Sequence, residues 1–347
     1  MNSFASTALE ERRVGKVYKG RLEAGLDLLF EWLTKSAPRV ALSLPSGKID
    51  FLILDQYVAS FVNSCHEEKL SFHLVKHAIL GLQTRYRYVR GHLPRSWDCL
   101  SAWEDSRPRG HRTPLTLELV RYLFTVAVSW SLEDRARAAL LLPLAVLLLV
   151  GFEGLLRPGE LVGLRRGDIL LPRPHSLSKN VVIAIRSPKN RKYFGRQQFV
   201  TITDPMCIRW LSWLIELLPS PVKLWPSSPS VFRATFQTLV KRGGLTGHRF
   251  TPAGLRAGGA THLVAMGMDL SRVQFLGRWR AHQTMAIYVQ EATAELVLMQ
   301  ISGPMSQCIS AVLQEAADSL LQPPRLPWGA FFSRRRQWRT LQTWRRQ

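Results

Sequence analysis

Two arginines lie near the predicted starts of helices, where an anion can bind. In residues 156–161, Pro158 suits the first position of a helix, so Arg157 lies at the helix N-terminus beside unpaired amides. Its guanidinium adds two directed donors for a phosphate. Glu160, three residues on, can hold that guanidinium in place. Taken alone, an Arg–Glu pair at a helix start is more often structural than catalytic.

The second arginine, Arg256, lies in a predicted helix that is rich in glycine. Thr251 is a suitable N-cap and Pro252 a suitable first helical residue, which puts Arg256 about one turn into the helix. Gly258 and Gly259 follow, and each costs the helix roughly 1 kcal/mol. Such a cost is offset by close packing or by the close approach of a ligand backbone.

A tryptophan and a tyrosine complete the candidate site. Trp279 ends the segment 276–279, and Tyr288 follows nine residues later. A tyrosine hydroxyl, with a free pKa of about 10, becomes a nucleophile once its proton is removed or nearby cations favour the phenolate. Each aromatic residue alone is more often part of a core, so the argument depends on their placement relative to Arg256.

The order and spacing of these residues resemble those of the tyrosine recombinases, or phage-integrase-type site-specific recombinases, over roughly residues 114–300. Arg256 lies 99 residues after Arg157, Trp279 lies 23 further on and Tyr288 another 9, and all three spacings are ordinary for that family. The resemblance assigns catalytic positions to Arg157, Lys189, Arg256, Trp279 and Tyr288, with Glu160 in support.

The resemblance implies a DNA strand exchange reaction that needs no metal or other cofactor. In the family, the tyrosine oxygen attacks a DNA phosphate and leaves a 3′-phosphotyrosyl bond and a free 5′-hydroxyl; the hydroxyl of a second strand then reverses the step. Arg157 and Arg256 would stabilise the transition-state charge. Trp279 would donate its indole N–H to the same oxygens, and Lys189, in the turn of a predicted hairpin with other basic residues, would protonate the leaving oxygen.

The sequence departs from the family pattern at one position. Ala253 stands where the His of the family's His-x-x-Arg motif should begin. We interpret His248 and His262, on either side of Arg256, as structural, with His248 the better replacement because it lies in the approach to the helix. The missing imidazole affects proton transfer more than DNA binding. The alternative hypothesis is therefore a DNA-binding descendant that has lost catalysis.

The elements that must position these residues form two domains. Apolar residues recur at helical spacing around residues 22–33, 54–62 and 74–82, and the third helix is expected to continue to residue 90. There Arg85, Arg87 and Arg90 alternate with tyrosines, either as a solvated face or as a face that contacts DNA phosphates. Polar residues 105–114, with Pro and Gly, indicate a linker.

The second domain is predicted to be mainly helical with a small antiparallel sheet, an α+β fold. Residues 115–156 are expected to be helical, and the apolar run 138–152, too short for a membrane span, is expected to be a buried helix. Residues 181–186 and 197–202 indicate a hairpin. Residues 290–321 are expected to pack either on a neighbouring protomer or on their own domain. The predicted divisions are an N-terminal tail (1–14), a core-binding domain (15–105), a linker (106–113), a catalytic domain with a C-terminal helix (114–321) and a basic tail (322–347).

Composition agrees with a nucleic-acid partner. The 347 residues carry 47 Lys and Arg against 25 Asp and Glu, a net charge of +22, which favours a polyanion. The four cysteines form no CxxC pair, which argues against a zinc site or a disulfide framework and for a reducing, intracellular location. We therefore expect a recombinase of mobile DNA that acts as a homotetramer on double-stranded DNA, away from membranes, in a nucleus or a nucleoid.

Overall fold

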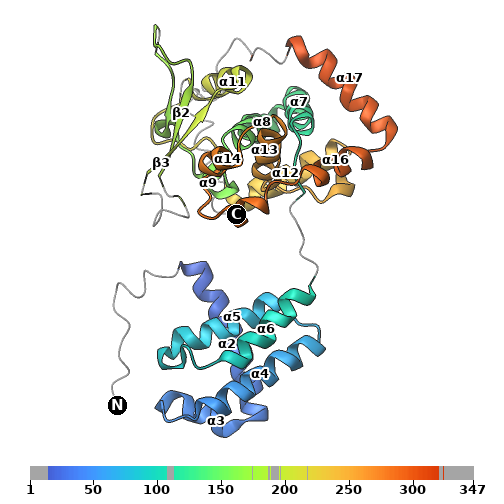
Figure 1. Ribbon diagram of the computed structural model, residues 1–347. Helices are drawn as coiled ribbons and strands as arrows, with labels where there is room; N and C mark the ends of the chain where they lie inside the picture. The colour runs from blue at the N-terminus through green and yellow to red at the C-terminus, as the bar shows by residue number, and fades with distance from the viewer. Residues whose placement is uncertain are drawn as a thin grey trace. The chain divides into compact units, whose positions relative to one another are not determined.

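The computed structural model describes residues 15–107, 113–173, 175–186, 188, 195, 197–216, 218–319 and 323 (Figure 1). Contacts divide the chain into two compact units, residues 1–110 and residues 111–347, called here the N-terminal and C-terminal units. The boundary lies within the predicted linker. Lys189 and the basic tail, except for residue 323, lie outside the described residues.

The N-terminal unit is a bundle of helices around one apolar core. α2 packs mainly on α5 and α4 packs on α6 (Figure 1). The three predicted periodicities correspond to α2, α4 and α5, whereas α6 was not predicted. The helices are α2 (Lys16–Ser36), α3 (Pro38–Ser43), α4 (Phe51–Glu67), α5 (Phe72–Arg85) and α6 (Pro94–Ser106), with 3₁₀ turns η1 (Leu44–Ser46) and η2 (Arg87–Val89).

The helix predicted to continue to residue 90 ends earlier. α5 ends at Arg85, and Tyr86 leaves the helical conformation with φ −115° and ψ 87°. The following turn buries Val89 completely in the core, while the Tyr88 hydroxyl donates to the carbonyl of Leu44. Burial of Val89 and the hydrogen bond of Tyr88 outweigh continuation of the helix. The side chains of Arg85, Arg87 and Arg90 are exposed.

Asp55 ties α4 to the start of α6. Its buried carboxylate accepts hydrogen bonds from the backbone N–H of Arg95 and Ser96, both at 2.9 Å, and from the Ser96 hydroxyl at 2.6 Å. These donors lie in the first turn of α6, where backbone N–H groups have no partner within the helix. Asp55 thus caps α6 from another helix.

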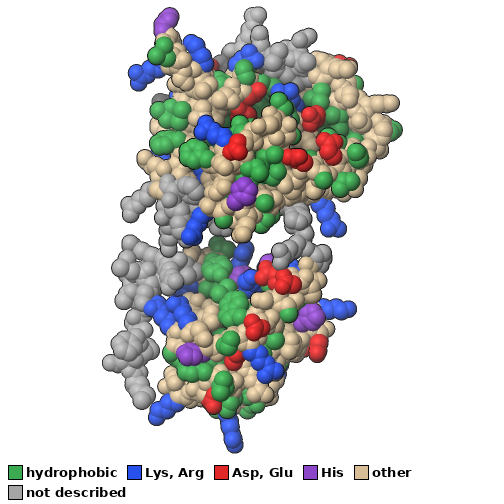
Figure 2. Space-filling model, viewed as in Figure 1, with side chains coloured by type: hydrophobic (Ala, Val, Ile, Leu, Met, Phe, Trp, Pro, Cys, Tyr) green, Lys and Arg blue, Asp and Glu red, His purple; other side chains and the backbone are tan. Residues whose placement is uncertain are grey.

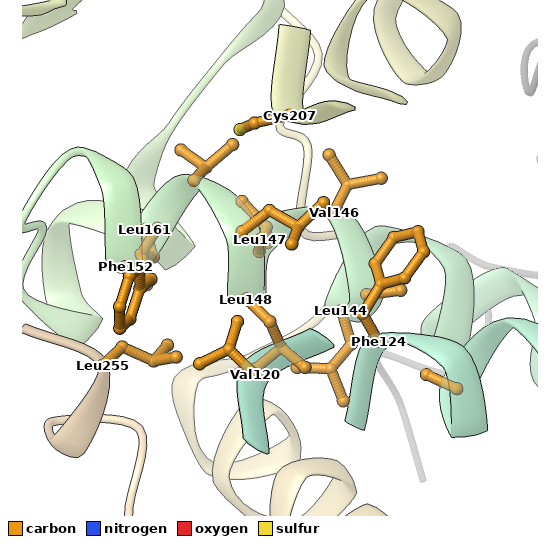
Figure 3. Close-up of a cluster of buried hydrophobic side chains, with 14 of the residues drawn as sticks. Val120, Phe124, Leu144, Val146, Leu147, Leu148, Phe152, Leu161, Cys207 and Leu255 are labelled. Atoms are coloured by element: carbon orange, nitrogen blue, oxygen red, sulfur yellow. The ribbon is translucent and has the colours of Figure 1, made fainter. Parts of the chain in front are cut away.

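The C-terminal unit is built around α7 (Leu117–Glu133) and α8 (Arg135–Glu153), which pack side by side. The expected helical stretch over residues 115–156 is broken because Asp134 caps α8: its Oδ1 accepts from the N–H of Ala136 at 3.1 Å and of Arg137 at 3.2 Å. Val120 and Phe124 of α7 meet Leu144 and Leu148 of α8 in the core (Figure 3).

α8 is the central core helix of this unit. By length and composition its window Ala136–Glu153 could cross a membrane, but 67% of that window is buried inside the structure. The predicted buried helix over residues 138–152 is therefore confirmed. The other helices are α9 (Pro158–Gly163), α11 (Pro205–Ile215), α12 (Pro229–Arg242), α13 (Gly254–Ala265), α14 (Leu270–Gly277), α15 (His282–Ala286), α16 (Glu291–Gln300) and α17 (Gly303–Ser319), with 3₁₀ turns η3 (Arg166–Asp168) and η4 (Thr246–His248).

A three-stranded antiparallel sheet flanks these helices in the order β1 (Ile169–Leu170), β2 (Val181–Ile185) and β3 (Gln198–Ile202). The predicted hairpin is β2–β3, with Ile183 opposite Val200 and both side chains buried. The short strand β1 was not predicted. The fold class, mainly α with a small antiparallel sheet, is confirmed.

The C-terminal helix α17 packs on α7 of its own unit. Ile309 is buried in the core, and Met305, Val312 and Leu313 pack against it. Residues 290–321 were expected to pack either on a neighbouring protomer or on their own domain. In this single chain, α17 packs on its own domain.

Candidate active site

The helix that carries Arg256 begins later than predicted. α13 starts at Gly254, and Ala253 precedes it with no side-chain cap. The carbonyl of Thr251, not its hydroxyl, takes part: it accepts the N–H of Gly254 at 2.8 Å. The carbonyl of Gly254 in turn accepts the N–H of Leu115 at 3.1 Å, which ties this helix start to the segment before α7. The expected Thr251 cap is therefore wrong.

The glycines of α13 allow two backbone segments to approach the helix. A Cβ on Gly258 would lie 1.7 Å from the carbonyl oxygen of Leu115, and one on Gly259 would lie 2.2 Å from that of Phe152. Of the two explanations for these glycines, the structure supports close packing of protein backbone.

Arg256 is the centre of the site, and its side chain is only 1% exposed. Nη1 donates to the carbonyl of Leu155 and Nη2 to the carbonyl of Gly277. The guanidinium carbon lies 4.1 Å from the ring centroid of Trp279 and 5.5 Å from that of Tyr288. Both hydrogen-bond acceptors are neutral carbonyls, so no directly bonded carboxylate cancels the positive charge.

Trp279 and Tyr288 pack on each other as well as on Arg256. Their ring centroids are 5.1 Å apart with an interplanar angle of 49°. Trp279 is buried, whereas Tyr288 is half-buried just after α15. Thr261 of α13 holds the backbone there: its hydroxyl donates to the carbonyl of Tyr288 at 3.2 Å and accepts from the N–H of Gln290 at 3.0 Å. Three residues singled out in the sequence thus form one contact cluster.

The first arginine occupies the predicted helix start. Arg157 is the N-cap of α9 and Pro158 the first helical residue, as expected. Glu160 accepts twice from Arg157, through Oε2 from the backbone N–H and through Oε1 from Nη1, both at 2.9 Å. The carboxylate therefore fixes both the backbone and the side chain of Arg157.

Arg278 is a member of the cluster that sequence analysis did not select. Its Nη2 lies 3.0 Å from Oε2 of Glu160 and 3.3 Å from the carbonyl oxygen of Leu155, and the residue is buried. Leu155 therefore accepts from Arg256 and Arg278, and Glu160 from Arg157 and Arg278. The only local signal was its position between Gly277 and Trp279, which does not distinguish it from an exposed arginine.

Burial and the clustered charges shift the ionisation of this network. Burial alone would raise the pKa of Glu160, but Arg278 and Arg157 outweigh it and lower that pKa. Burial, then Arg157 and Arg278, lower the pKa of Arg256 to about 9, which leaves it cationic at neutral pH. Burial also lowers the pKa of Arg278, against the opposing effect of Glu160. The site is thus a buried excess of positive charge, suited to an anion.

A comparison with protein families gives a match over the segment that contains this site. The model of the Phage integrase family matches residues 131–295, a segment that contains every candidate catalytic position named above. This segment is therefore similar to the phage integrase family. No curated protein gave a match.

Solved structures of integrases and recombinases are similar to this chain, and one of them, a lambda integrase, shares its fold at a TM-score above 0.5. A lambda integrase dimer bound to a COC′ core site is similar with a TM-score of 0.51 and 15% identity, covering 82% of this chain and 92% of that one. XerA recombinase gives a TM-score of 0.41 at 18% identity, covering 84% and 94%. XerH bound to its difH substrate gives a TM-score of 0.47 at 17% sequence identity, and the match covers 70% of this chain and 67% of that one.

The two histidines near the phage-integrase motif pack on phenylalanines. His248 of η4 is half-buried with its ring centroid 5.5 Å from that of Phe250, and His262 of α13 lies 5.6 Å from Phe152. Within the described ranges, no three His, Cys, Asp or Glu side chains gather in a group that could hold a metal ion.

Proposed function

We propose that this phage-integrase chain is a site-specific DNA recombinase that cleaves and rejoins DNA through a 3′-phosphotyrosyl intermediate. The observation that supports this most is the contact of one buried guanidinium, that of Arg256, with both Trp279 and Tyr288. A buried cation in contact with the tyrosine can bind the phosphate that the tyrosine oxygen attacks.

In the proposed cleavage step, Oη of Tyr288 gives its proton to solvent and forms a bond to the DNA phosphorus. The bond from phosphorus to the 5′-oxygen breaks, and Lys189 gives that oxygen a proton. Rejoining reverses the step: a 5′-hydroxyl of a second strand attacks the phosphotyrosine and releases Tyr288. Arg157 and Arg256 stabilise the charge on the nonbridging oxygens.

The buried state of Arg256 adds a requirement. With 1% of the residue exposed, a phosphate reaches its guanidinium only when the segment with Trp279 and Tyr288 moves aside. The stacking of Trp279 on Arg256 holds the guanidinium in its plane. Donation of the indole N–H to the phosphate is the further role we propose for Trp279 once DNA is bound.

The proposed partner is double-stranded DNA inside the cell, in a nucleus or nucleoid. Solved relatives include XerH on difH and a Tn1549 transposon integrase on transposon end DNA. Residues 15–105 act as the core-binding domain and residues 114–321 as the catalytic domain, with Arg85, Arg87 and Arg90 on phosphates. Four identical chains assemble on the DNA during exchange.

Ala253 supports a second candidate, a DNA-binding protein that has lost catalysis. A general acid–base group contributes roughly 10²–10⁴ in rate, and here the residue at the motif position has no titratable group. This candidate keeps DNA affinity and forms no covalent intermediate.

The test is a search for covalent adducts on nicked duplexes of random sequence, which trap the cleaved state. We expect a denaturant-resistant adduct with the wild type and none with Tyr288→Phe, which removes one hydroxyl. Arg157→Ala and Arg256→Ala should each lower the rate of adduct formation on the order of a hundredfold. Tyr18→Phe, in α2 of the other unit, is the matched control. Adducts that persist in Tyr288→Phe would exclude Tyr288 as the nucleophile.

A further inference from the structure

Arg278 connects the two catalytic arginines of the proposed recombinase. Through Nη2 it contacts Glu160, which holds Arg157, and Leu155, whose carbonyl also accepts from Arg256. Glu160 Oε2 accepts both Arg278 Nη2 at 3.0 Å and the backbone N–H of Arg157 at 2.9 Å. One side chain therefore contacts the two groups that fix Arg157 and Arg256.

The backbone at both ends of this connection is strained. Leu155 has φ 48° and Arg278 has φ 57°, which lie in the left-handed region that residues other than glycine rarely adopt. α14 ends at Gly277, so the left-handed position falls on Arg278 and not on the glycine beside it. A Cβ on Gly277 would lie 1.6 Å from the ring of Trp279, so the glycine is required for that packing.

Electrostatics make the connection necessary. Arg157 and Arg278 lower the pKa of Arg256, Arg157 lowers that of Arg278, and Glu160 is the carboxylate that offsets this repulsion. Both oxygens of Glu160 are engaged, so its orientation depends on Arg157 and Arg278 together. Without Arg278, Glu160 has one cationic partner and is free to turn with it.

We propose that Arg278 is a positioning residue that sets the orientation of Arg157 through Glu160 and of Arg256 through Leu155. It is 5% exposed and acts through its neighbours, without contact to the DNA. The inference extends the proposed function, because the orientation matters for a phosphate bound between the two arginines.

The kinetic test compares Arg278→Met and Arg278→Lys with Arg272→Met, which removes an exposed arginine from α14. At saturating nicked duplex, Arg278→Met should form the adduct about ten- to a hundredfold more slowly, the effect of misplacing a catalytic group, with DNA affinity unchanged. Arg278→Lys keeps a positive charge beside the Glu160 carboxylate and should recover part of the rate of adduct formation. A wild-type rate for Arg278→Met would overturn the inference.

A methylphosphonate at the cleaved position separates positioning from general loss of fold. It removes one negatively charged nonbridging oxygen, so the arginines have less transition-state charge to neutralise. A misplaced arginine should therefore lower the rate less on this substrate. The penalty of Arg278→Met should therefore shrink on this substrate, as should that of Arg157→Ala. An equal penalty on both substrates would show that the variant only lowers the folded fraction.

A measurement without DNA keeps the inference separate from the proposed function. The ¹⁵Nε signals of Arg157 and Arg256, assigned with Arg157→Lys and Arg256→Lys, should both move in Arg278→Met and stay in place in Arg272→Met. Unmoved signals in Arg278→Met overturn the inference whether or not the chain cleaves DNA. A wild type that binds DNA and never forms an adduct overturns only the proposed recombinase.

Discussion

At the scale of single residues, Ala253 decides how fast the proposed reaction runs. Ala253 is half-buried and lies directly before α13, three positions ahead of Arg256. A histidine there restores an acid–base group, so Ala253→His should raise the rate of adduct formation by up to about 10²-fold. The rate is measured on nicked duplexes in single turnover.

The matched comparison is His248→Ala. If His248 has taken over proton transfer, that variant slows the wild type and Ala253→His rescues it. If His248 only packs on Phe250, the wild-type rate is unchanged. Binding without adduct in all of these variants would favour the protein that has lost catalysis.

Glu160 should make the C-terminal unit sensitive to acid. Its folded pKa is lowered below 4.5, so its contribution to the free energy of unfolding is complete above pH 4.5 and is lost as the pH falls through the folded pKa. Glu160→Gln leaves buried arginines without their carboxylate and should cost about 3–5 kcal/mol at neutral pH. In denaturant titrations that cost should shrink below pH 4.5.

The control is the exposed Glu31, which pairs with Lys35. Glu31→Gln should change the free energy of unfolding little. A Glu160→Gln cost that does not depend on pH would contradict the role assigned to Glu160.

The resemblance to the tyrosine recombinases implied that Arg256, Trp279 and Tyr288 belong to one site, and their side chains do pack together. Arg278 could not be found in this way. Its acid partner Glu160 lies 118 residues earlier, and its burial depends on how α14 packs on the turn after α8. Contacts of that range arise only from the assembled fold.

In terms of elements, apolar periodicity predicted α2, α4 and α5, whereas α6 was not predicted. Leu93, Trp97 and Leu100 nevertheless recur at helical spacing at the start of α6 and pack in the core, and Asp55 anchors its first turn. The break between α7 and α8 depends on a single side-chain cap, Asp134. Strand β1, two residues long, is defined by its pairing with β2 and has no pattern of its own.

The packing of α13 predicts a stability effect of Gly258→Ala. The new Cβ would meet the Leu115 carbonyl, a backbone atom that cannot rotate away, so the variant should lose about 1–3 kcal/mol or more. A Cβ on Gly159 of α9 would meet no atom within 4 Å, so Gly159→Ala should raise the free energy of unfolding by about 0.4–1 kcal/mol. Denaturant unfolding of both variants measures the difference; equal stabilities would contradict the close approach.

At the scale of the whole molecule, charge governs association. On the face shown in Figure 2, Lys and Arg side chains are spread over both units. The net charge of +22 should make DNA affinity fall steeply with salt. Removing residues 333–347, with six arginines and no acid, should flatten the slope of log affinity against log salt by up to about 0.9 per arginine that contacts a phosphate.

The control for this truncation is removal of residues 1–14, a segment of similar length whose two Glu and two Arg cancel. That variant should keep the wild-type slope. Fluorescence anisotropy of labelled duplex DNA between low and physiological salt gives both slopes. A wild-type affinity that does not depend on salt would contradict binding through phosphates.

The central claim, that Tyr288 is joined to DNA during cleavage, is tested most directly by mapping the adduct. The wild-type chain is trapped on a nicked duplex and digested with nuclease and protease, and its peptides are sequenced by mass spectrometry. If Tyr288 is the nucleophile, a nucleotide is joined through its 3′-phosphate to Tyr288 and the released strand carries a free 5′-hydroxyl. A nucleotide on another residue, or a 5′-phosphate on the released strand, would contradict it.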